Sequence, residues 1–133
     1  MKALSLLQPW ASLIVMGVKT IETRSWTTAY RGPLLIHASL RRSGAAFAVV
    51  PPFNKYIADY EALPRGYIIG EVNLVDVMRV EMLPISTDSL RSRTLEENAF
   101  GDFTKGRWAW ILEDAVAWDE VVPATGKLGL WDF

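Results

Sequence analysis

Three charged side chains of alternating sign lie close together near the start of the chain. Lys19 and Glu22 are three residues apart, and Arg24 follows Glu22 by two. A lysine beside a carboxylate lowers the pKa of that carboxylate, and such a pair can supply a general base and an electrostatic stabiliser for hydrolysis. The same spacing is common in surface ion pairs, which are worth ~0–1 kcal/mol. Spacing alone therefore favours an ordinary ion pair over a catalytic one.

These charges lie on a segment with the alternation of a strand. In residues 21–26, successive side chains point to opposite faces, so Glu22, Arg24 and Trp26 share one face. That face would carry a carboxylate, a guanidinium and an indole. The combination is unusual for a core strand and typical of the wall of a binding site.

The strand at 21–26 is expected to follow a short helix. A first strand is predicted over 2–7, and Pro9 suits the first position of the helix, where its missing N–H costs nothing. Gly17 can adopt the left-handed conformation that ends the helix. Further strands are predicted over 34–38, 67–80, 107–113, 121–122 and 128–133, and short helices within 39–63 and around 90–99.

The number and spacing of these segments indicate the fold class. Many short strands with turn signals favour a barrel or a sandwich over a parallel α/β sheet. Gly70, inside the longest predicted strand, indicates a bend or a bulge of the kind that closed barrels need. We therefore expect a mixed α/β but mainly β fold. It would be one domain over 1–133, a small β-barrel of six to seven strands with short helices inserted, including one after the first strand.

Composition excludes several classes of site. Half of the 133 residues are hydrophobic, which is ample material for one core. The chain has no cysteine, so disulfides, thiolate zinc sites and a cysteine nucleophile are excluded, and a single histidine, His37, excludes a histidine-rich metal site. His37 lies in an apolar run, where a lone histidine is usually a core residue with satisfied hydrogen bonds. We expect no metal and no cofactor.

No part of the sequence predicts a membrane segment. Apolar runs fall short of the ~20 residues that a membrane-spanning helix needs. The N-terminus is read as a first strand and not as a signal peptide, because no small-residue cleavage site follows it. We therefore expect a soluble, cytoplasmic protein.

Charge is distributed unevenly along the chain, although the formal net charge is only −1. Residues 1–66 hold eight basic and three acidic side chains, for a net of +5. Residues 67–133 hold six basic and twelve acidic side chains, for a net of −6. This asymmetry is compatible with a one-sided contact to phosphate. It is equally compatible with two halves that neutralise each other across a compact fold.

Six tryptophans are a large number for a chain of this length. Trp110 and Trp131 have apolar neighbours, and we assign them to the core. Trp10 and Trp26 flank the charged segment, which makes them the better candidates for stacking on a base. Gln8, two residues before Trp10, adds a donor and an acceptor able to read a base edge.

Six short motifs, in order over essentially the whole chain, match one known family. They are LSLLQPWA at 4–11, GVKTIETR at 17–24, IGEV at 69–72, ENAFG at 97–101, RWAW at 107–110 and GKLGLW at 126–131. With these motifs the chain resembles the ASCH domain (activating signal cointegrator homology), as a small single-domain member of prokaryotic type.

The resemblance implies a β-barrel similar to PUA domains, the RNA-binding modules of pseudouridine synthases and archaeosine transglycosylases, with a cleft beside the first helix. The resemblance also implies binding of RNA or other nucleic acid in that cleft. Some small bacterial members resemble amidohydrolases of acylated cytidine nucleosides that use a lysine, a threonine and a glutamate, and ribonuclease activity has been attributed to a prokaryotic member. Here the lysine matches Lys19 and the glutamate matches Glu97, while Glu22 occupies the threonine position.

The leading hypothesis is a module that binds RNA, another single-stranded nucleic acid or a nucleotide. Its expected contacts are Gln8, Trp10, Lys19, Arg24, Trp26 and Arg31, with Arg41 or Arg42 as further phosphate contacts.

Two alternatives come from other functional classes. One is a hydrolase of RNA or of a modified nucleoside, with Lys19, Glu22 and Glu97 as the catalytic groups. The other is an interaction domain that has kept the barrel and lost the ligand, with the charged segment as a strip of surface ion pairs.

Overall fold

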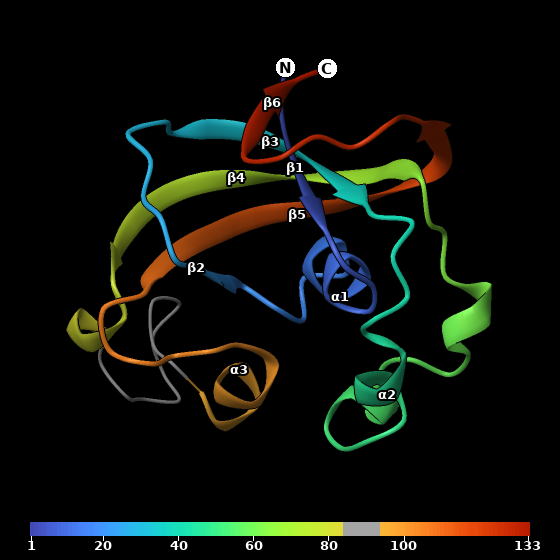
Figure 1. Ribbon diagram of the computed structural model, residues 1–133, viewed down its shortest axis with the longest axis horizontal. Coiled ribbons are helices and arrows are strands. Elements are labelled where there is room, and N and C mark those ends of the chain that lie inside the picture. The colour runs from blue at the N-terminus through green and yellow to red at the C-terminus, as the bar shows by residue number, and fades with distance from the viewer. Residues whose placement is uncertain (84–93) are drawn as a thin grey trace.

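Six strands in the described part of the chain form one sheet that curls into a half-barrel (Figure 1). The computed structural model describes residues 1–83 and 94–133. The strand order across the sheet is β2-β5-β4-β3-β1-β6. The strands are β1 (Lys2–Leu6), β2 (Ile21–Arg24), β3 (Gly32–Ala38), β4 (Tyr67–Arg79), β5 (Trp108–Pro123) and β6 (Leu130–Asp132). The predicted fold class, mainly β with short inserted helices, is confirmed.

The helices of the described residues are short, and one of them directly follows the first strand as predicted. They are α1 (Trp10–Val15), α2 (Ala45–Ala48), the 3-10 turns η1 (Phe53–Lys55), η2 (Tyr60–Ala62) and η3 (Val80–Met82), and α3 (Leu95–Phe100). The predicted helix around 90–99 corresponds to α3, and its part at 90–93 lies outside the described residues. Within the described ranges, none of the helices has the length and apolar character needed to cross a membrane.

Between β1 and β2 the chain passes from the strand next to β6 to the far edge of the sheet. Strand β1 pairs in parallel with β3, while β2 lies at the opposite edge and pairs only with β5 in the described sheet. Parallel neighbours need a crossover connection, and here α1 is part of it. Gly17 follows the helix in the predicted left-handed conformation, with a φ of +78°, whereas Pro9 caps the helix and is not its first residue as predicted. The crossover therefore packs α1 against the sheet and ends at β2 on its edge.

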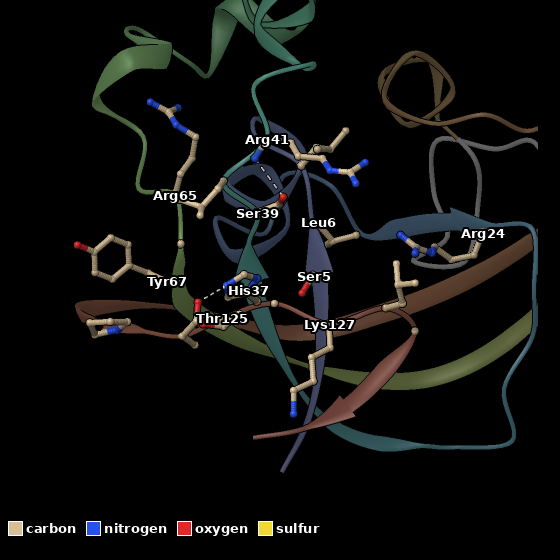
Figure 2. Close-up of a pocket in the computed structure, with 18 residues that line it drawn as sticks. Ser5, Leu6, Arg24, His37, Ser39, Arg41, Arg65, Tyr67, Thr125 and Lys127 are labelled. Atoms are coloured by element: carbon tan, nitrogen blue, oxygen red, sulfur yellow. Dashed lines mark hydrogen bonds between the residues drawn. The ribbon is translucent and has the colours of Figure 1, made fainter.

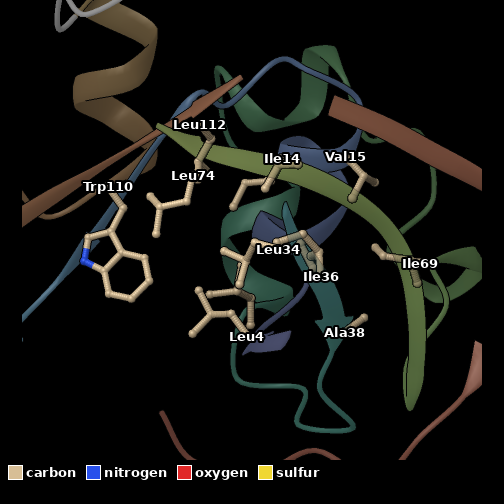
Figure 3. Close-up of a cluster of buried hydrophobic side chains, with 13 residues drawn as sticks. Leu4, Ile14, Val15, Leu34, Ile36, Ala38, Ile69, Leu74, Trp110 and Leu112 are labelled. Atoms are coloured by element: carbon tan, nitrogen blue, oxygen red, sulfur yellow. The ribbon is translucent and has the colours of Figure 1, made fainter. Parts of the chain in front are cut away.

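Helix α1 is buried on almost every side because it contributes to two hydrophobic clusters. Ile14 and Val15 pack with the β3 and β4 side chains of the main core (Figure 3). Leu13 packs in a second cluster with Phe53 and Phe100, between α1 and the helices outside the sheet. Burial on almost every side explains why the sequence of the helix is a nearly continuous apolar run. The helix is thus fixed by both clusters at once.

Strand β5 differs from the prediction. The sequence predicts separate strands over 107–113 and 121–122, but the structure has one strand of 16 residues, Trp108–Pro123. Its pairing with β4 shifts register at three places, and Asp114 has a φ of 54°. Register shifts of this kind bend a strand without ending it. In the sequence, the polar residues at the bend resemble a turn, which is the reason for the error.

One of these register shifts falls at Gly70, where the sequence predicts a bend or a bulge, and the prediction is confirmed. A Cβ atom on Gly70 would lie 2.3 Å from the Val116 carbonyl oxygen and 2.8 Å from Cγ1 of Val15. The glycine therefore lets α1 approach β4 closely.

Replacing Gly70 with alanine should destabilise the fold, because the added methyl group would overlap both the backbone of β5 and the helix. Overpacking of this kind costs about 1–3 kcal/mol of unfolding free energy. Urea denaturation followed by circular dichroism would measure the change. Asn73→Ala on the same strand is the matched control and should change stability by less than about 0.5 kcal/mol. Equal stability of Gly70→Ala and the native chain would contradict the close approach.

Candidate functional site

A cavity of about 360 Å³ lies between the N-terminal end of α1, strand β2 and the segment after α3. Its walls combine apolar rings with charged groups. Among the residues that line it are Leu6, Trp10, Glu22, Arg24, Phe47 and Asp102. Helix α1 supplies Trp10 and β2 supplies both charged groups of the strand.

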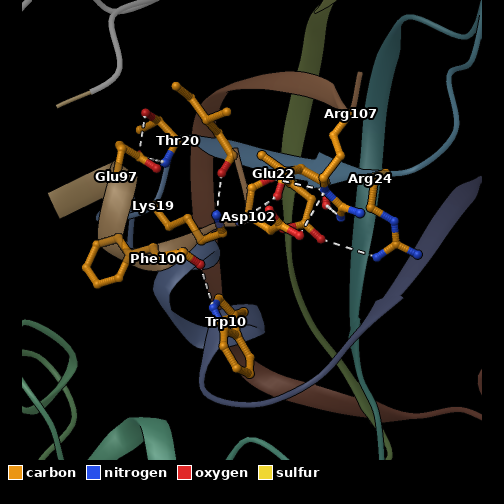
Figure 4. Close-up of polar contacts among 11 residues, drawn as sticks. Trp10, Lys19, Thr20, Glu22, Arg24, Glu97, Phe100, Asp102 and Arg107 are labelled. Carbon is orange, nitrogen blue, oxygen red and sulfur yellow. Dashed lines mark hydrogen bonds and ion pairs between the residues drawn. The ribbon is translucent and has the colours of Figure 1, made fainter. Parts of the chain in front are cut away.

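Trp10 is a fixed wall of this cavity. Its indole N–H donates a hydrogen bond of 2.7 Å to the Phe100 carbonyl oxygen at the end of α3 (Figure 4). The ring lies against Phe47 at a centroid distance of 5.0 Å and against Phe53 at 5.8 Å. The hydrogen bond and the ring contacts together hold the indole in one orientation and join α1 to α3.

Glu22 and Arg24 project from β2 on the same face, as the alternation predicts. Arg24 donates to the Glu22 carboxylate at 3.2 Å, and the Lys19 ammonium lies 3.7 Å from the other oxygen of that carboxylate. The Glu22 side chain is 10% exposed and the Arg24 side chain 25% exposed. The carboxylate therefore lies between two cations and still opens onto the cavity.

Lys19 lies behind Glu22 and does not line the cavity. Its side chain is completely enclosed, and its ammonium donates to the Ile21 carbonyl oxygen. A buried ammonium is costly unless hydrogen bonds and opposite charges compensate for the lost water. Glu22 provides such a charge directly, and Glu97 adds a second one nearby. Lys19 thus holds the site together from inside.

Glu97 is also buried, at 4% exposure, and it clamps the turn before β2. One carboxylate oxygen accepts hydrogen bonds from the Thr20 amide and, at 2.9 Å, from the Thr20 hydroxyl. The other oxygen is buried without a hydrogen-bond partner among the described residues. Burial raises the pKa of the Glu97 carboxyl, although the Lys19 charge and the Thr20 hydrogen bonds oppose this shift. The structure brings Lys19, Glu22 and Glu97 together, and of the three Glu22 alone is part of the cavity wall.

Gln8 does not face a ligand site, contrary to the role predicted for it. The side chain is fully buried. Its amide nitrogen donates to the Pro64 carbonyl oxygen at 2.9 Å, and its amide oxygen accepts from the Ser12 amide at 3.0 Å. Both ends of the amide are used by the backbone, so Gln8 anchors α1 and cannot read a base edge.

Trp26 lies outside the cavity wall as well. Its ring meets the Trp110 ring edge-on at 4.8 Å, and the guanidinium carbon of Arg24 lies 5.5 Å from the ring centre. Strand β2 ends at Arg24, and Trp26 packs against the main core. The Trp26 indole therefore positions Arg24, and it is not placed to stack on a base in this cavity. Trp110 and Trp131 are buried, and their predicted core position is confirmed.

The other predicted phosphate contacts are spread over the surface. Arg31 is exposed and donates to nearby carbonyl oxygens, with Asp76 at 3.8 Å, away from the cavity. Arg42 forms an ion pair with Glu61. Arg41 lines a different hollow of the surface. Among the predicted cations, Arg24 alone lines the cavity described here.

Sequence reasoning missed Phe47 and Asp102 on the wall of the cavity. Phe47 lies on α2, in an alanine-rich stretch, and the residue is 48% exposed. Asp102 follows α3, and its amide donates to the Thr23 hydroxyl at 3.1 Å. An isolated aromatic residue on a predicted helix is the one signal that could have pointed to Phe47. The contact between Asp102 and Thr23 joins residues 79 positions apart, and no local pattern reports it.

Replacing Lys19 with alanine should destabilise the fold strongly, because Glu22 and Glu97 would lose the cation that compensates their buried charges. Removing one partner of a buried ion pair costs about 3–5 kcal/mol. Urea denaturation would measure the loss. Arg31→Ala removes an exposed cation and should change stability by less than about 0.5 kcal/mol. A loss for Lys19→Ala no larger than that of Arg31→Ala would show that the ammonium has no such role.

The raised pKa of Glu97 predicts a pH dependence of stability. The folded state holds this proton more tightly than the unfolded state, so the unfolding free energy falls as the pH rises from the ordinary carboxyl value of 4.5 through the raised pKa. Glu97→Gln removes this titration while keeping a group that accepts from Thr20. The stability of Glu97→Gln relative to the native chain should therefore increase with pH in urea titrations. The same comparison for the exposed Glu120→Gln should stay flat, and a flat result for Glu97→Gln would refute the prediction.

Comparisons with known proteins agree with this architecture. A family model described as the ASCH domain matches residues 4–122. Activating signal cointegrator 1 of Mus musculus is 37% identical over 84 residues, and that of Homo sapiens is 36% identical over 84 residues. These matches include 56% of this chain and 14% of each relative, so the chain spans a small part of the relatives' length.

Solved structures show the same fold. The crystal structure of ASCH from Zymomonas mobilis superposes with a TM-score of 0.51 at 21% identity, over 87% of this chain and 68% of that chain. A mutant form of the same protein gives a TM-score of 0.52 at 21% identity, over 87% of this chain and 69% of that chain. ASCH domains have a PUA-like fold that is generally linked to RNA binding. Because the family model matches well over half of its length, this chain belongs to the ASCH domain family.

Proposed function

We propose that this ASCH domain binds single-stranded nucleic acid, RNA foremost, or a nucleotide, by seating one base in the cavity beside α1. The observation that carries the proposal is the ion pair of Glu22 and Arg24 on a wall that also holds the rings of Trp10 and Phe47. Aromatic rings next to a few convergent polar groups are typical of small-molecule sites and of base recognition.

The two charged groups suit the edge of a base. The Glu22 carboxylate accepts hydrogen bonds, so it can receive an amino or ring N–H group, whereas Arg24 donates and can meet a carbonyl oxygen, a ring nitrogen or a phosphate. Each of the four bases presents both kinds of group on its Watson–Crick edge, in a different order. Lys19, behind the carboxylate, compensates its charge and fixes its position. The pair would therefore distinguish bases by the order in which they present donor and acceptor.

The size of the cavity supports a single base and not a duplex. About 360 Å³ is at the lower end of the range of small-molecule sites. Sequence-specific RNA recognition usually takes unpaired bases, because these can be separated from their neighbours and placed against aromatic side chains. A loop, a strand end or a free nucleotide would fit this requirement.

The alternative hydrolase needs Lys19 and Glu97 at the substrate. Both side chains are buried and neither lines the cavity, and the ammonium of Lys19 is held by the Ile21 carbonyl oxygen and by Glu22. A general base or an electrostatic stabiliser has to reach the reacting atoms. This arrangement supports positioning roles for the two residues and favours binding over hydrolysis. The concave wall formed by Glu22 and Arg24 likewise favours a ligand site over a strip of surface ion pairs.

Short single-stranded RNA labelled with fluorescein, titrated at low salt and followed by anisotropy, tests the proposal. Arg24→Ala removes a charge-assisted hydrogen bond worth about 1.5–3 kcal/mol, so affinity should fall by roughly 10-fold to 100-fold. Glu22→Gln keeps the shape and exchanges one acceptor for a donor, so it should change the preference among oligonucleotides of the four bases.

Arg31→Ala is the matched control, because it removes the same charge outside the cavity. Its affinity should stay within about 3-fold of the native value, since it loses only screened attraction to phosphate. Circular dichroism would verify that each variant is folded. Equal losses for Arg24→Ala and Arg31→Ala would reject the cavity as the site, and no binding at micromolar concentrations would reject the function.

A further inference from the structure

A second, larger hollow of about 1090 Å³ lies between the end of β1, the segment that follows β3, the start of β4 and the connection between β5 and β6 (Figure 2). Its described lining contains four cations, Arg24, Arg41, Arg65 and Lys127, and no aspartate or glutamate. A concave site lined by one sign of charge concentrates ligands of the opposite sign. We propose that this hollow, called the His37 pocket below, binds the phosphate-bearing part of a nucleotide.

The His37 pocket is lined by a buried histidine, and one ring nitrogen of this histidine has no hydrogen-bond partner among the described residues. His37 is 2% exposed, and its Nε2 lies 2.8 Å from the Ala124 carbonyl oxygen. A carbonyl oxygen only accepts, so Nε2 carries a hydrogen, and in the neutral ring Nδ1 is left as an acceptor. This Nδ1 is buried without a hydrogen-bond partner among the described residues. His37 is therefore a core histidine as expected, but its Nδ1 lacks a partner among the described residues, and a ligand N–H or O–H would complete its hydrogen bonding.

Gly126 leaves open the space that this nitrogen faces. A Cβ atom on Gly126 would lie 2.9 Å from Nδ1 of His37 and 2.7 Å from the Ser5 hydroxyl oxygen. The Ser5 oxygen accepts from the Trp131 indole at 3.1 Å, which leaves its own hydrogen free to donate. A donor and an acceptor thus converge beside a residue without a side chain. Any other residue at 126 would crowd both of them.

The cations of the pocket differ in how many hydrogen bonds and ion pairs they already form within the protein. Arg65 donates to the Tyr60 carbonyl oxygen at 3.1 Å and lies 3.7 Å from the Glu61 carboxylate. Arg41 and Lys127 form no ion pair with any carboxylate of the described residues. Figure 2 shows the guanidinium groups of Arg24 and Arg41 on the side of the hollow where Leu6 lies. Arg41 is therefore the cation best placed to meet a phosphate, with Lys127 at the rim.

The His37 pocket adjoins the cavity of the proposed base site. Leu6, Leu7 and Arg24 line both. A strand with one base in the smaller cavity could thus place a neighbouring phosphate and sugar in the larger one. The phosphate chemistry follows from the His37 pocket itself, whereas the choice of a nucleotide as its carrier rests on the proposed function.

His37 supplies a direct probe, because it is the only histidine of the chain and its ring gives one set of imidazole signals. Protein labelled with 15N-histidine would be titrated separately with cytidine 5′-monophosphate, cytidine and inorganic phosphate. The monophosphate should shift the His37 signals and bind at least about 10-fold more tightly than the other two, since it alone offers both kinds of contact. Unmoved His37 signals would overturn the proposal, and equally tight binding of inorganic phosphate or of cytidine would overturn a nucleotide as the ligand.

Two variants test the pocket against general charge attraction. Arg41→Ala should weaken binding of the monophosphate by roughly 10-fold. Arg31→Ala, which removes an equal charge elsewhere, should stay within about 3-fold. Gly126→Ala should abolish the ligand-induced shift of the His37 signals by filling the space beside Nδ1. Equal effects of Arg41→Ala and Arg31→Ala would overturn the proposal even if Gly126→Ala failed to fold.

The proposal for the base site and the proposal for the His37 pocket can be refuted independently. If RNA binds and Arg24→Ala weakens it while the monophosphate leaves His37 unmoved, only the His37 pocket is refuted. If the monophosphate shifts His37 while Glu22→Gln leaves the base preference of RNA binding unchanged, only the base site is refuted.

Discussion

The buried ammonium of Lys19 is the constraint on which the candidate site depends. An enclosed positive charge needs hydrogen bonds and opposite charges at short range, and here they come from the Ile21 carbonyl oxygen, Glu22 and Glu97. These partners belong to the start of β2 and to α3, which are far apart in the sequence. One charge therefore ties together two walls of the cavity. The carboxylate that opens onto the cavity is held in place because its other side is committed to the lysine.

The same cavity depends on α1, which two hydrophobic clusters share. Ile14 and Val15 belong to the core inside the half-barrel, and Leu13 belongs to the cluster under the outer helices. The hydrogen bond from Trp10 to the Phe100 carbonyl oxygen adds a polar contact between the helix and α3. A wall supported from both sides loses little conformational entropy when a ligand binds. Such support suits a site that selects a base by fixed groups.

Local features of the fold and the site could be predicted from the sequence, whereas contacts between distant segments could not. The alternation in 21–26 placed Glu22 and Arg24 on one face, and Gly70 marked a bulge, because both signals depend on neighbouring residues. The burial of Gln8 depends on Pro64, 56 positions away, and the Glu97 clamp on Thr20 spans 77 positions. No pattern within a short window carries such information. For that reason the types of the site residues were easier to predict than their roles.

The uneven charge of the chain allowed two interpretations, neutralisation between the two halves and a one-sided contact to phosphate. Some basic residues in the structure support the first interpretation, and others support the second. Three ion pairs join the basic half to the acidic half and neutralise charge across the fold. They are Lys2 with Asp132, Arg31 with Asp76, and Lys55 with Glu96. Arg41 is a remaining basic residue without an ion pair among the described residues, and it lines a hollow whose described lining lacks acidic side chains. Unpaired cations around a concave surface raise the local potential, whereas paired ones cancel at short range. The excess positive charge of the first half therefore acts on ligands mainly where its cations remain unpaired, which is at the hollow that adjoins the proposed base site.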